Sequence, residues 1–243
     1  MFRRLLAVAL ASAAVGVVPV LHAAPAQAAP ASNDQIVQSW YGDFLDRDDP
    51  ASDPGRSYWV GMLDRGVPRQ FVLGSILRSY EYANLEVSSY YSDLLGRAPD
   101  SGAGYWIDQT ANHDMAWEWV AQNVLASREF VNRYNYSGAT GYIRNLYYPI
   151  LGRFPTDADA GGISYWVNRY NQVGALNVVR ELWYTDEAVR NRLSDHYNHL
   201  LLRDVDYNGV NYWAPRERQS DITVQVELAS TAEYADLAYY LYY

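Results

Sequence analysis

The stretch YYSDLLGRAPDSGAGYW, residues 90–106, decides the fold, because the chain carries something close to it four times. Each copy runs from a tyrosine, through two apolar residues and an arginine, to a Tyr-Trp pair. The arginines are Arg47, Arg97, Arg153 and Arg203, and the pairs are Tyr58-Trp59, Tyr105-Trp106, Tyr165-Trp166 and Tyr212-Trp213. Units this short cannot bury their own apolar faces, so we expect neighbouring copies to stack.

The residues before each arginine predict a helix. In every copy a tyrosine is followed, three and four residues later, by apolar side chains, and this spacing puts all three on one helical face. Gly96 and Gly152 come next, where glycine closes a helix in the left-handed conformation. Asp46 and Leu202 hold that place in the other two copies, so we expect those helices to end differently.

Two further helices complete each unit. The second carries the Tyr-Trp pair, which we place on its inner face. The third ends at a serine or threonine, and an acid follows in the next first turn: Glu81, Glu129, Glu187 or Glu233. The fold predicted is therefore all-α, with about four tandem units of roughly three helices. Residues 135–141 have linker composition and extend the spacing between copies two and three, which predicts two pairs of repeats, 29–134 and 142–243.

The chain begins like an exported protein. Arg3 and Arg4 precede an almost wholly apolar run over residues 5–21, and Ala26-Gln27-Ala28 has the pattern of a cleavage site. We interpret residues 1–28 as a Sec-type secretion signal peptide that is cleaved after Ala28. A secreted, extracellular protein without membrane contact is then expected.

Composition excludes several classes of function. The chain has no cysteine, so neither disulfides nor thiolate chemistry is available to it. Its formal net charge of −9 disfavours nucleic acid and anionic membranes as partners. The 23 tyrosines and eight tryptophans must either build the core or form contact surfaces.

These repeats resemble the bacterial domain of unknown function DUF4214. Copy two carries the resemblance most fully, through Tyr91, Leu95-Gly96-Arg97, Pro99-Asp100, Tyr105-Trp106 and Glu129-Phe130. Copy three keeps much of this pattern with a longer loop, and copies one and four lose the glycine before the arginine. The resemblance implies helical modules, repeated in tandem, in exported or surface-attached proteins. It implies no catalytic residues.

The repeated arginines and tryptophans are predicted to be structural. An arginine between a helix end and a tight loop typically donates to carbonyls and to a nearby carboxylate. The four glutamates above, or loop acids such as Asp100, are the candidate partners. An arginine that binds an anionic ligand is the alternative. Trp59, Trp106, Trp166 and Trp213 share the register of the apolar stripe, which favours the core over sugar-stacking platforms.

Other residues are candidates for ligand contact. Tyr134, Tyr136, Tyr239, Tyr242 and Tyr243 are the aromatic residues for which we expect exposure. Asp204, Asp206 and Asn208 follow the start of a calcium-binding loop, but Pro215 stands where a bidentate glutamate belongs. We therefore predict no cofactor, with calcium as the alternative. His196 and His199 could face one metal ion, but the neighbouring sequence offers no third strong ligand, so no metal is expected there.

No nucleophile, general acid or general base is assembled by any motif, so the chain is not expected to be an enzyme. The leading hypothesis is a secreted, non-catalytic scaffold module that binds a protein at the cell surface or outside the cell. A glycan-binding module, assisted by calcium, is the alternative, and a hydrolase is a more distant one.

Overall fold

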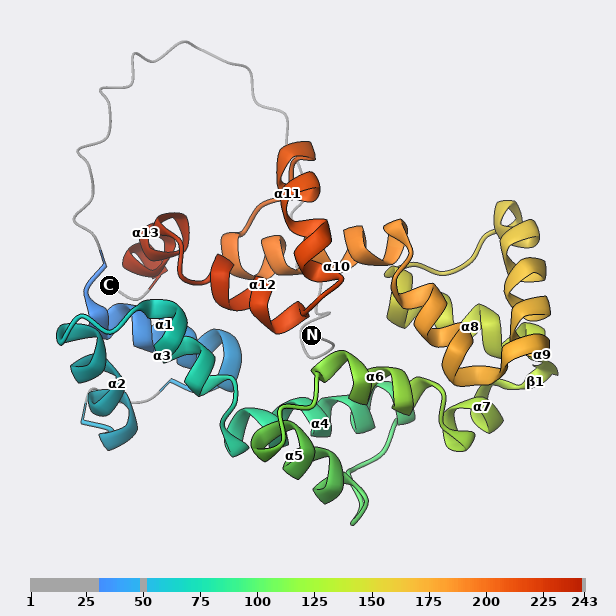
Figure 1. Ribbon diagram of the computed structural model, residues 1–243, viewed down its shortest axis with the longest axis horizontal. Coiled ribbons are helices and arrows are strands. Elements are labelled where there is room, and N and C mark those ends of the chain that lie inside the picture. Colours follow the sequence, from blue (N-terminus) through green and yellow to red (C-terminus); the bar gives the residue numbers. More distant parts are fainter. Residues whose placement is uncertain (1–30, 49–51, 242–243) are drawn as a thin grey trace, which may run out of the picture.

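A computed structural model describes residues 31–48 and 52–241, and the described chain is built from α-helices (Figure 1). The predicted all-α class is confirmed. The segment β1 (Tyr136–Gly138) forms only a local bridge, between Ser137 and Ala139. Within the described ranges, every helix is too short or too polar to cross a bilayer. The predicted signal peptide, Tyr242 and Tyr243 lie outside the described residues.

The helices follow one another with short connections. The first half contains α1 (Asn33–Leu45), α2 (Pro54–Asp64), α3 (Arg69–Ile76), α4 (Tyr80–Leu95), α5 (Ala103–Asn112), α6 (Trp117–Leu125) and α7 (Arg128–Tyr134). The second half contains α8 (Ala139–Leu151), the 3-10 turn η1 (Asp157–Asp159), α9 (Ala160–Trp183), α10 (Asp186–Leu201), α11 (Tyr207–Glu217), α12 (Asp221–Leu228) and α13 (Ala232–Leu241). Helix α9 is kinked at Gly174, whose φ of 78° ends one helical segment and starts another.

Four helix ends share one conformation. The residue before each repeated arginine is left-handed, with φ of 54° at Asp46, 62° at Gly96, 71° at Gly152 and 52° at Leu202. The expectation that Asp46 and Leu202 would close their helices differently is wrong. The left-handed turn returns the next N–H to the helix, as when Arg47 N donates to Tyr41 O at 3.2 Å. These closing contacts outweigh the cost of about 1–2 kcal/mol that a side chain meets in this conformation.

The first and last helices pack together, so the chain closes on itself (Figure 1). Helix α1 contacts α13, while α12 contacts both α3 and α6. The indole Nε1 of Trp40, in α1, donates to the carbonyl of Ala229 at 3.1 Å, and the Tyr234 hydroxyl reaches Asp43 Oδ2 at 2.6 Å. The two halves of the chain are therefore joined at their outer ends as well as through residues 135–141.

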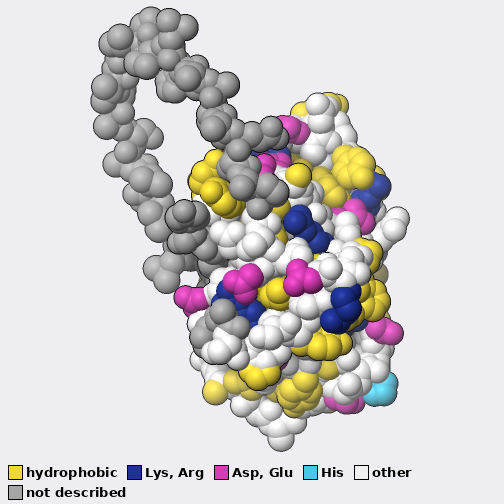
Figure 2. Space-filling model, turned by 90° about the vertical axis from the view of Figure 1, so that its left-hand side faces the viewer, with side chains coloured by type: hydrophobic (Ala, Val, Ile, Leu, Met, Phe, Trp, Pro, Cys, Tyr) yellow, Lys and Arg dark blue, Asp and Glu magenta, His cyan; other side chains and the backbone are white. Residues whose placement is uncertain are grey.

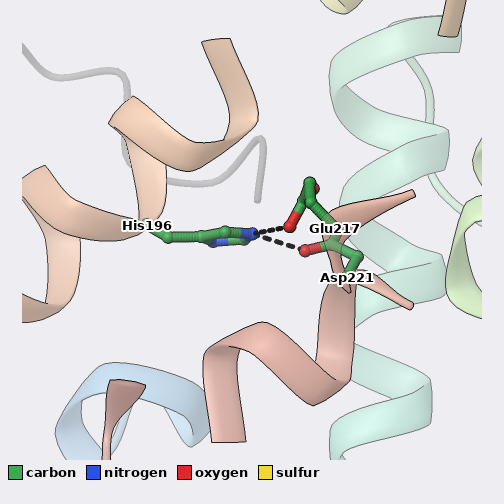
Figure 3. Close-up of side chains that lie close together, drawn as sticks. All are labelled: His196, Glu217 and Asp221. Carbon is green, nitrogen blue, oxygen red and sulfur yellow. Dashed lines mark ion pairs between the residues drawn. The ribbon is translucent and has the colours of Figure 1, made fainter. Parts of the chain in front are cut away.

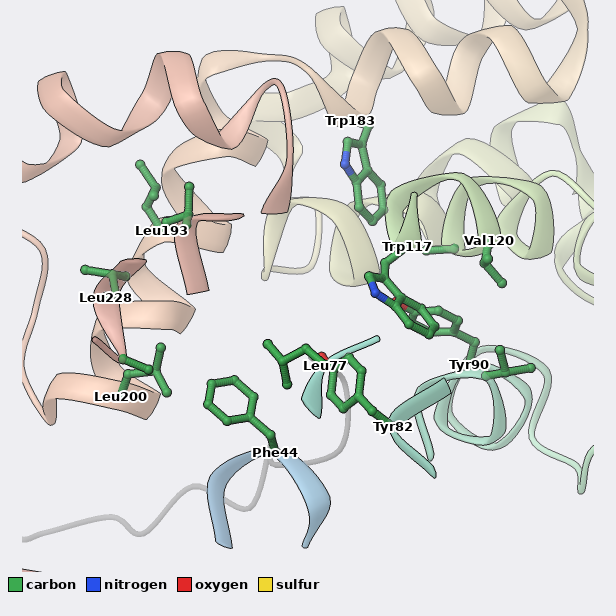
Figure 4. Close-up of a cluster of buried hydrophobic side chains, with 14 of the residues drawn as sticks. Phe44, Leu77, Tyr82, Tyr90, Trp117, Val120, Trp183, Leu193, Leu200 and Leu228 are labelled. Atoms are coloured by element: carbon green, nitrogen blue, oxygen red, sulfur yellow. The ribbon is translucent and has the colours of Figure 1, made fainter. Parts of the chain in front are cut away.

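One core lies inside this arrangement (Figure 4). Side chains from distant helices converge there, among them Phe44, Leu77 and Tyr82 from the first half and Leu200 and Leu228 from the second. Helices α2, α5 and α11 and the first segment of α9 lie at the periphery (Figure 1). These peripheral elements are the ones that carry the four Tyr-Trp pairs.

Candidate functional site

Each repeated arginine contacts the glutamate that the sequence put forward as its partner. The distances from arginine Nε to glutamate Oε1 are 3.2 Å for Arg47–Glu81, 2.6 Å for Arg97–Glu129, 2.5 Å for Arg153–Glu187 and 2.5 Å for Arg203–Glu233. The glutamate stands in the first turn of α4, α7, α10 or α13. Each ion pair thus ties the end of one helix to the beginning of a later one.

The same guanidiniums lie over buried tyrosine rings. Their carbon atoms stand 4.4–5.3 Å from the ring centroids of Tyr41, Tyr91, Tyr147 and Tyr197. Burial raises the pKa of three of these phenols, Tyr91, Tyr147 and Tyr197, so they stay neutral. Each arginine thus has an aromatic face and a carboxylate within its own chain. These contacts favour a structural role over binding of an anionic ligand.

Replacing Arg97 by alanine is expected to lower the thermal unfolding midpoint at neutral pH. The guanidinium donates to both oxygens of Glu129 and forms a second ion pair with Asp100 at 2.9 Å. Hydrogen bonds from Arg97 hold the pKa of Glu129 below its usual value. A carboxylate with a lowered pKa stabilises the folded state above its unfolded pKa, about 4.5, and this contribution disappears as the pH falls through the folded pKa.

The difference between wild type and Arg97→Ala should therefore shrink as the pH falls below about 4.5. Differential scanning calorimetry across that range measures it. The control is Arg128→Ala, which removes an exposed arginine beside Glu129. Equal midpoints for Arg97→Ala and Arg128→Ala at neutral pH would contradict the structural role.

The Tyr-Trp pairs divide between core and surface. Trp213 is buried, whereas Trp59, Trp106 and Trp166 are half-buried against the core. The tyrosine beside each of them is 53–57% exposed. Placing both members on the inner face was therefore wrong, because neighbouring residues on a helix point about 100° apart. Each tyrosine instead packs edge-on against its tryptophan, with ring centroids 4.7–5.1 Å apart.

The other predicted contact tyrosines differ in exposure. Tyr136 is 78% exposed, while Tyr134 packs against Phe130 and Tyr239 is half-buried. In the last helix it is Tyr240, rather than Tyr239, that faces solvent. The buried face of α13 is formed by Tyr234, Ala235 and Ala238, and Tyr239 lies at its edge.

The loop considered for calcium and the two histidines also have clear positions. Asp206 Oδ1 accepts from Gly209 N at 2.6 Å and so caps α11, while Asp204 is exposed. His199 lies 3.1 Å from the carbonyl of Asp43, away from the buried His196. The two histidines therefore do not face a common point.

His196 instead meets two carboxylates in a buried cluster (Figure 3). Its Nε2 lies 2.6 Å from Asp221 Oδ1 and 3.4 Å from Glu217 Oε2. The imidazole comes from α10, and the carboxylates come from the end of α11 and the start of α12. Among the described residues this is the group of three titratable side chains that could hold a metal ion.

Further polar side chains surround this cluster. Arg192 Nε donates to Glu217 Oε1 at 2.7 Å, and its NH1 donates to the Trp183 carbonyl at 2.9 Å. Glu118, from α6, accepts from the backbone N–H of Asp221 at 2.5 Å. Four helices therefore meet at one buried polar centre.

Burial and mutual charge shift the titration of this centre. Burial lowers the pKa of His196, but the negative charges of Asp221 and Glu217 outweigh it and raise that pKa to about 10. Burial raises the pKa of Asp221, yet the positive charge of His196 brings it down to about 2. Burial and the charge of Asp221 raise the pKa of Glu118 to about 7. An imidazolium between carboxylates is thus the stable form without a metal ion.

Sequence reasoning missed Glu217, Asp221, Arg192 and Glu118. One signal was present: His196 occupies the position that Trp40 and Tyr90 hold in other copies. A histidine at a core position needs buried polar partners. The partners themselves come from helices whose meeting depends on closure of the chain, so no local spacing indicates them.

Comparison with known proteins bears on one part of the chain. Residues 121–179 match DUF4214, a domain of unknown function. The DUF4214 match runs from within α6 into the second segment of α9 and includes Arg153 and the pair Tyr165-Trp166. The expected resemblance is confirmed over that stretch. No curated protein and no solved structure matches the chain.

Proposed function

We propose that the chain is a secreted, non-catalytic scaffold of four tandem DUF4214-like units that binds a partner protein at the cell surface or outside the cell. The observation that carries this proposal is the recurrence of one exposed tyrosine on each peripheral helix: Tyr58, Tyr105, Tyr165 and Tyr212. Tyrosine supplies a large contact area at a low cost in conformational entropy.

The position of these tyrosines favours several points of contact over one pocket. They lie on α2, α5, α9 and α11, which stand at different places around the periphery (Figure 1). Seen from the end that carries α1, α2 and α13, apolar side chains are interspersed with acidic and arginine side chains and form no single continuous patch (Figure 2). Four equivalent small contacts suit a protein that bridges partners, because linked weak contacts add up to avidity.

A glycan-binding module is the second candidate. The observation that favours it is the edge-on packing of each exposed tyrosine against a half-buried or buried tryptophan, which makes a rigid aromatic ledge. Such a ledge presents an apolar ring face with a hydroxyl at its rim. Protein contact remains the first candidate, because the four ledges lie on separate helices.

The test compares two variants that remove exposed tyrosines. The first carries Tyr58→Ser, Tyr105→Ser, Tyr165→Ser and Tyr212→Ser. The control carries Tyr80→Ser and Tyr184→Ser, which remove exposed tyrosines outside the four pairs. Tagged full-length chains are used to capture proteins from cell-envelope and culture-medium fractions. We expect the fourfold variant to retain less than about one tenth of the partner that wild type and control capture.

Equal capture by wild type and the fourfold variant would contradict the proposal. A parallel titration with soluble cell-surface polysaccharides, followed by tryptophan fluorescence, tests the second candidate. Saturable polysaccharide binding that the fourfold variant loses, without capture of a protein, would favour the glycan-binding module instead.

A further inference from the structure

We propose that His196, Glu217 and Asp221 bind one divalent transition-metal ion, with Zn²⁺ as the ion that fits the donors best. The three side chains point at one another from α10 and from the junction of α11 and α12 (Figure 3). One ligand atom from each lies within 4.8 Å of the others. All three side chains are at least nine-tenths buried. The donors therefore converge on a point that is closed to bulk water.

The distances suit a small ion. Zn²⁺ holds nitrogen and oxygen at about 2.0–2.2 Å, which separates tetrahedral donors by about 3.4 Å. The separation of His196 Nε2 from Glu217 Oε2 is 3.4 Å. The separation of Nε2 from Asp221 Oδ1 is 2.6 Å and has to open by less than about 1 Å, which a rotation of the Asp221 side chain supplies.

Two of the donor atoms are held by ion pairs alone and make no hydrogen bond. His196 Nε2 and Glu217 Oε2 are buried, and neither makes a hydrogen bond of acceptable geometry. The close contacts of Nε2 are its ion pairs with Asp221 Oδ1 at 2.6 Å and Glu217 Oε2 at 3.4 Å. Buried polar atoms without a hydrogen bond are rare in native proteins. A metal ion between the donors satisfies both atoms at once.

The charge of the side chains around His196 also favours a bound cation. Three buried carboxylates, those of Glu118, Glu217 and Asp221, meet at this centre, and the permanent cation Arg192 is bonded to Glu217. With a neutral imidazole, Glu217 and Asp221 carry two negative charges against the one positive charge of Arg192, and Glu118 adds another when it is ionised. Excess charge in a medium of low dielectric constant is costly. One divalent cation offsets that excess.

Neighbouring side chains already hold the donors in place. Arg192 occupies Glu217 Oε1 and leaves Oε2 facing His196, and the Gln225 side chain donates to Asp221 Oδ1 at 3.0 Å. Such outer contacts orient the ligands of metal sites and tune their affinity. The site would join α10 to the junction of α11 and α12, so its role is structural rather than catalytic.

The ligand types select the class of ion. One imidazole nitrogen with two carboxylate oxygens suits Zn²⁺, Mn²⁺ and Fe²⁺. Ca²⁺ and Mg²⁺ prefer six or more oxygen ligands, or several retained waters, in a more open site. Selectivity for Zn²⁺ over Ca²⁺ therefore separates this site from the exposed acidic loop around Asp204.

The experiment measures metal binding to the full chain directly. Protein is unfolded in urea with chelator and refolded, and the metal-free form is titrated with Zn²⁺ by equilibrium dialysis and elemental analysis. We expect one Zn²⁺ per chain and no comparable binding of Ca²⁺. At free Zn²⁺ about 100 times its Kd, the unfolding equilibrium constant should fall about 100-fold. Absence of Zn²⁺ from correctly refolded protein would overturn the proposal.

A matched pair of variants locates the ion. His196→Gln should abolish binding, while His113→Gln, which removes an exposed histidine, should keep it. Retained binding by a folded His196→Gln variant would show that the ion sits elsewhere. X-ray absorption at the zinc edge of the wild-type protein supplies a second readout that needs no variant. One imidazole with oxygen ligands is expected, and two imidazoles would overturn the assignment.

Discussion

Arg192→Met is expected to cost about 3–5 kcal/mol of unfolding free energy, the magnitude seen when one partner is removed from a buried ion pair. The Arg192 and Glu217 side chains are 3% and 0% exposed and meet at 2.7 Å. Methionine keeps much of the side-chain volume but leaves Glu217 and Asp221 without their permanent cation. It also removes the donor to the Trp183 carbonyl. The loss is therefore electrostatic in the main, and urea denaturation followed by circular dichroism measures it.

Two further variants show whether lost charge or lost packing causes the destabilisation of Arg192→Met. Arg190→Met changes an exposed arginine on the same helix and is expected to alter stability by less than about 0.5 kcal/mol. The double variant Arg192→Met with Glu217→Leu removes both charges and should recover part of the loss, because no unpaired carboxylate then remains at that position. An Arg192→Met variant as stable as Arg190→Met would contradict the view that the buried ion pair of Arg192 with Glu217 stabilises the fold.

The parts of the fold that were predictable depend on local spacing. Tyrosine, apolar pair and arginine follow one another at helical intervals, and a serine or threonine with a nearby glutamate starts the next helix. That order made the four glutamates candidate partners of the arginines but left loop acids such as Asp100 open, and Arg97 contacts both Glu129 and Asp100. Helix ends were predictable where glycine occupies the left-handed position, as at Gly96 and Gly152.

Two predictions failed because residue type was taken to decide the local structure. Leu202 adopts the same left-handed backbone as the glycines because the contacts around it outweigh the strain. The Tyr-Trp pairs were treated as one apolar unit, although adjacent helical residues diverge and only the tryptophan turns toward the core. The centre at His196 could not be predicted, because its partners are separated along the chain and meet only when α6, α10, α11 and α12 assemble.

Trp40→Ala is expected to cost about 3–5 kcal/mol, because a large and fully buried ring is removed from the place where the chain closes. Trp40 is 0% exposed, and its Nε1 donates to the Ala229 carbonyl in the connection between α12 and α13. Trp40→Phe should cost less than Trp40→Ala, because phenylalanine keeps most of the packing. The remaining cost is about 1–3 kcal/mol, because the lost hydrogen bond leaves the buried Ala229 carbonyl unpaired. Urea unfolding monitored by circular dichroism ranks the two variants.

The same variant tests whether closure makes the two halves one cooperative body. Isolated helical arrays unfold in steps when their contacts are only between neighbours, whereas contacts between first and last helices couple the ends. With Trp40 intact, circular dichroism and tryptophan fluorescence should give one coincident transition. In Trp40→Ala the end helices α1 and α13 should exchange amide hydrogens faster than α4 and α8. The control is Trp119→Ala, a 46% exposed tryptophan on α6. If Trp40→Ala cost no more than Trp119→Ala, the packing of α1 against α13 would contribute little, and stability would instead come from each unit and its sequential neighbours.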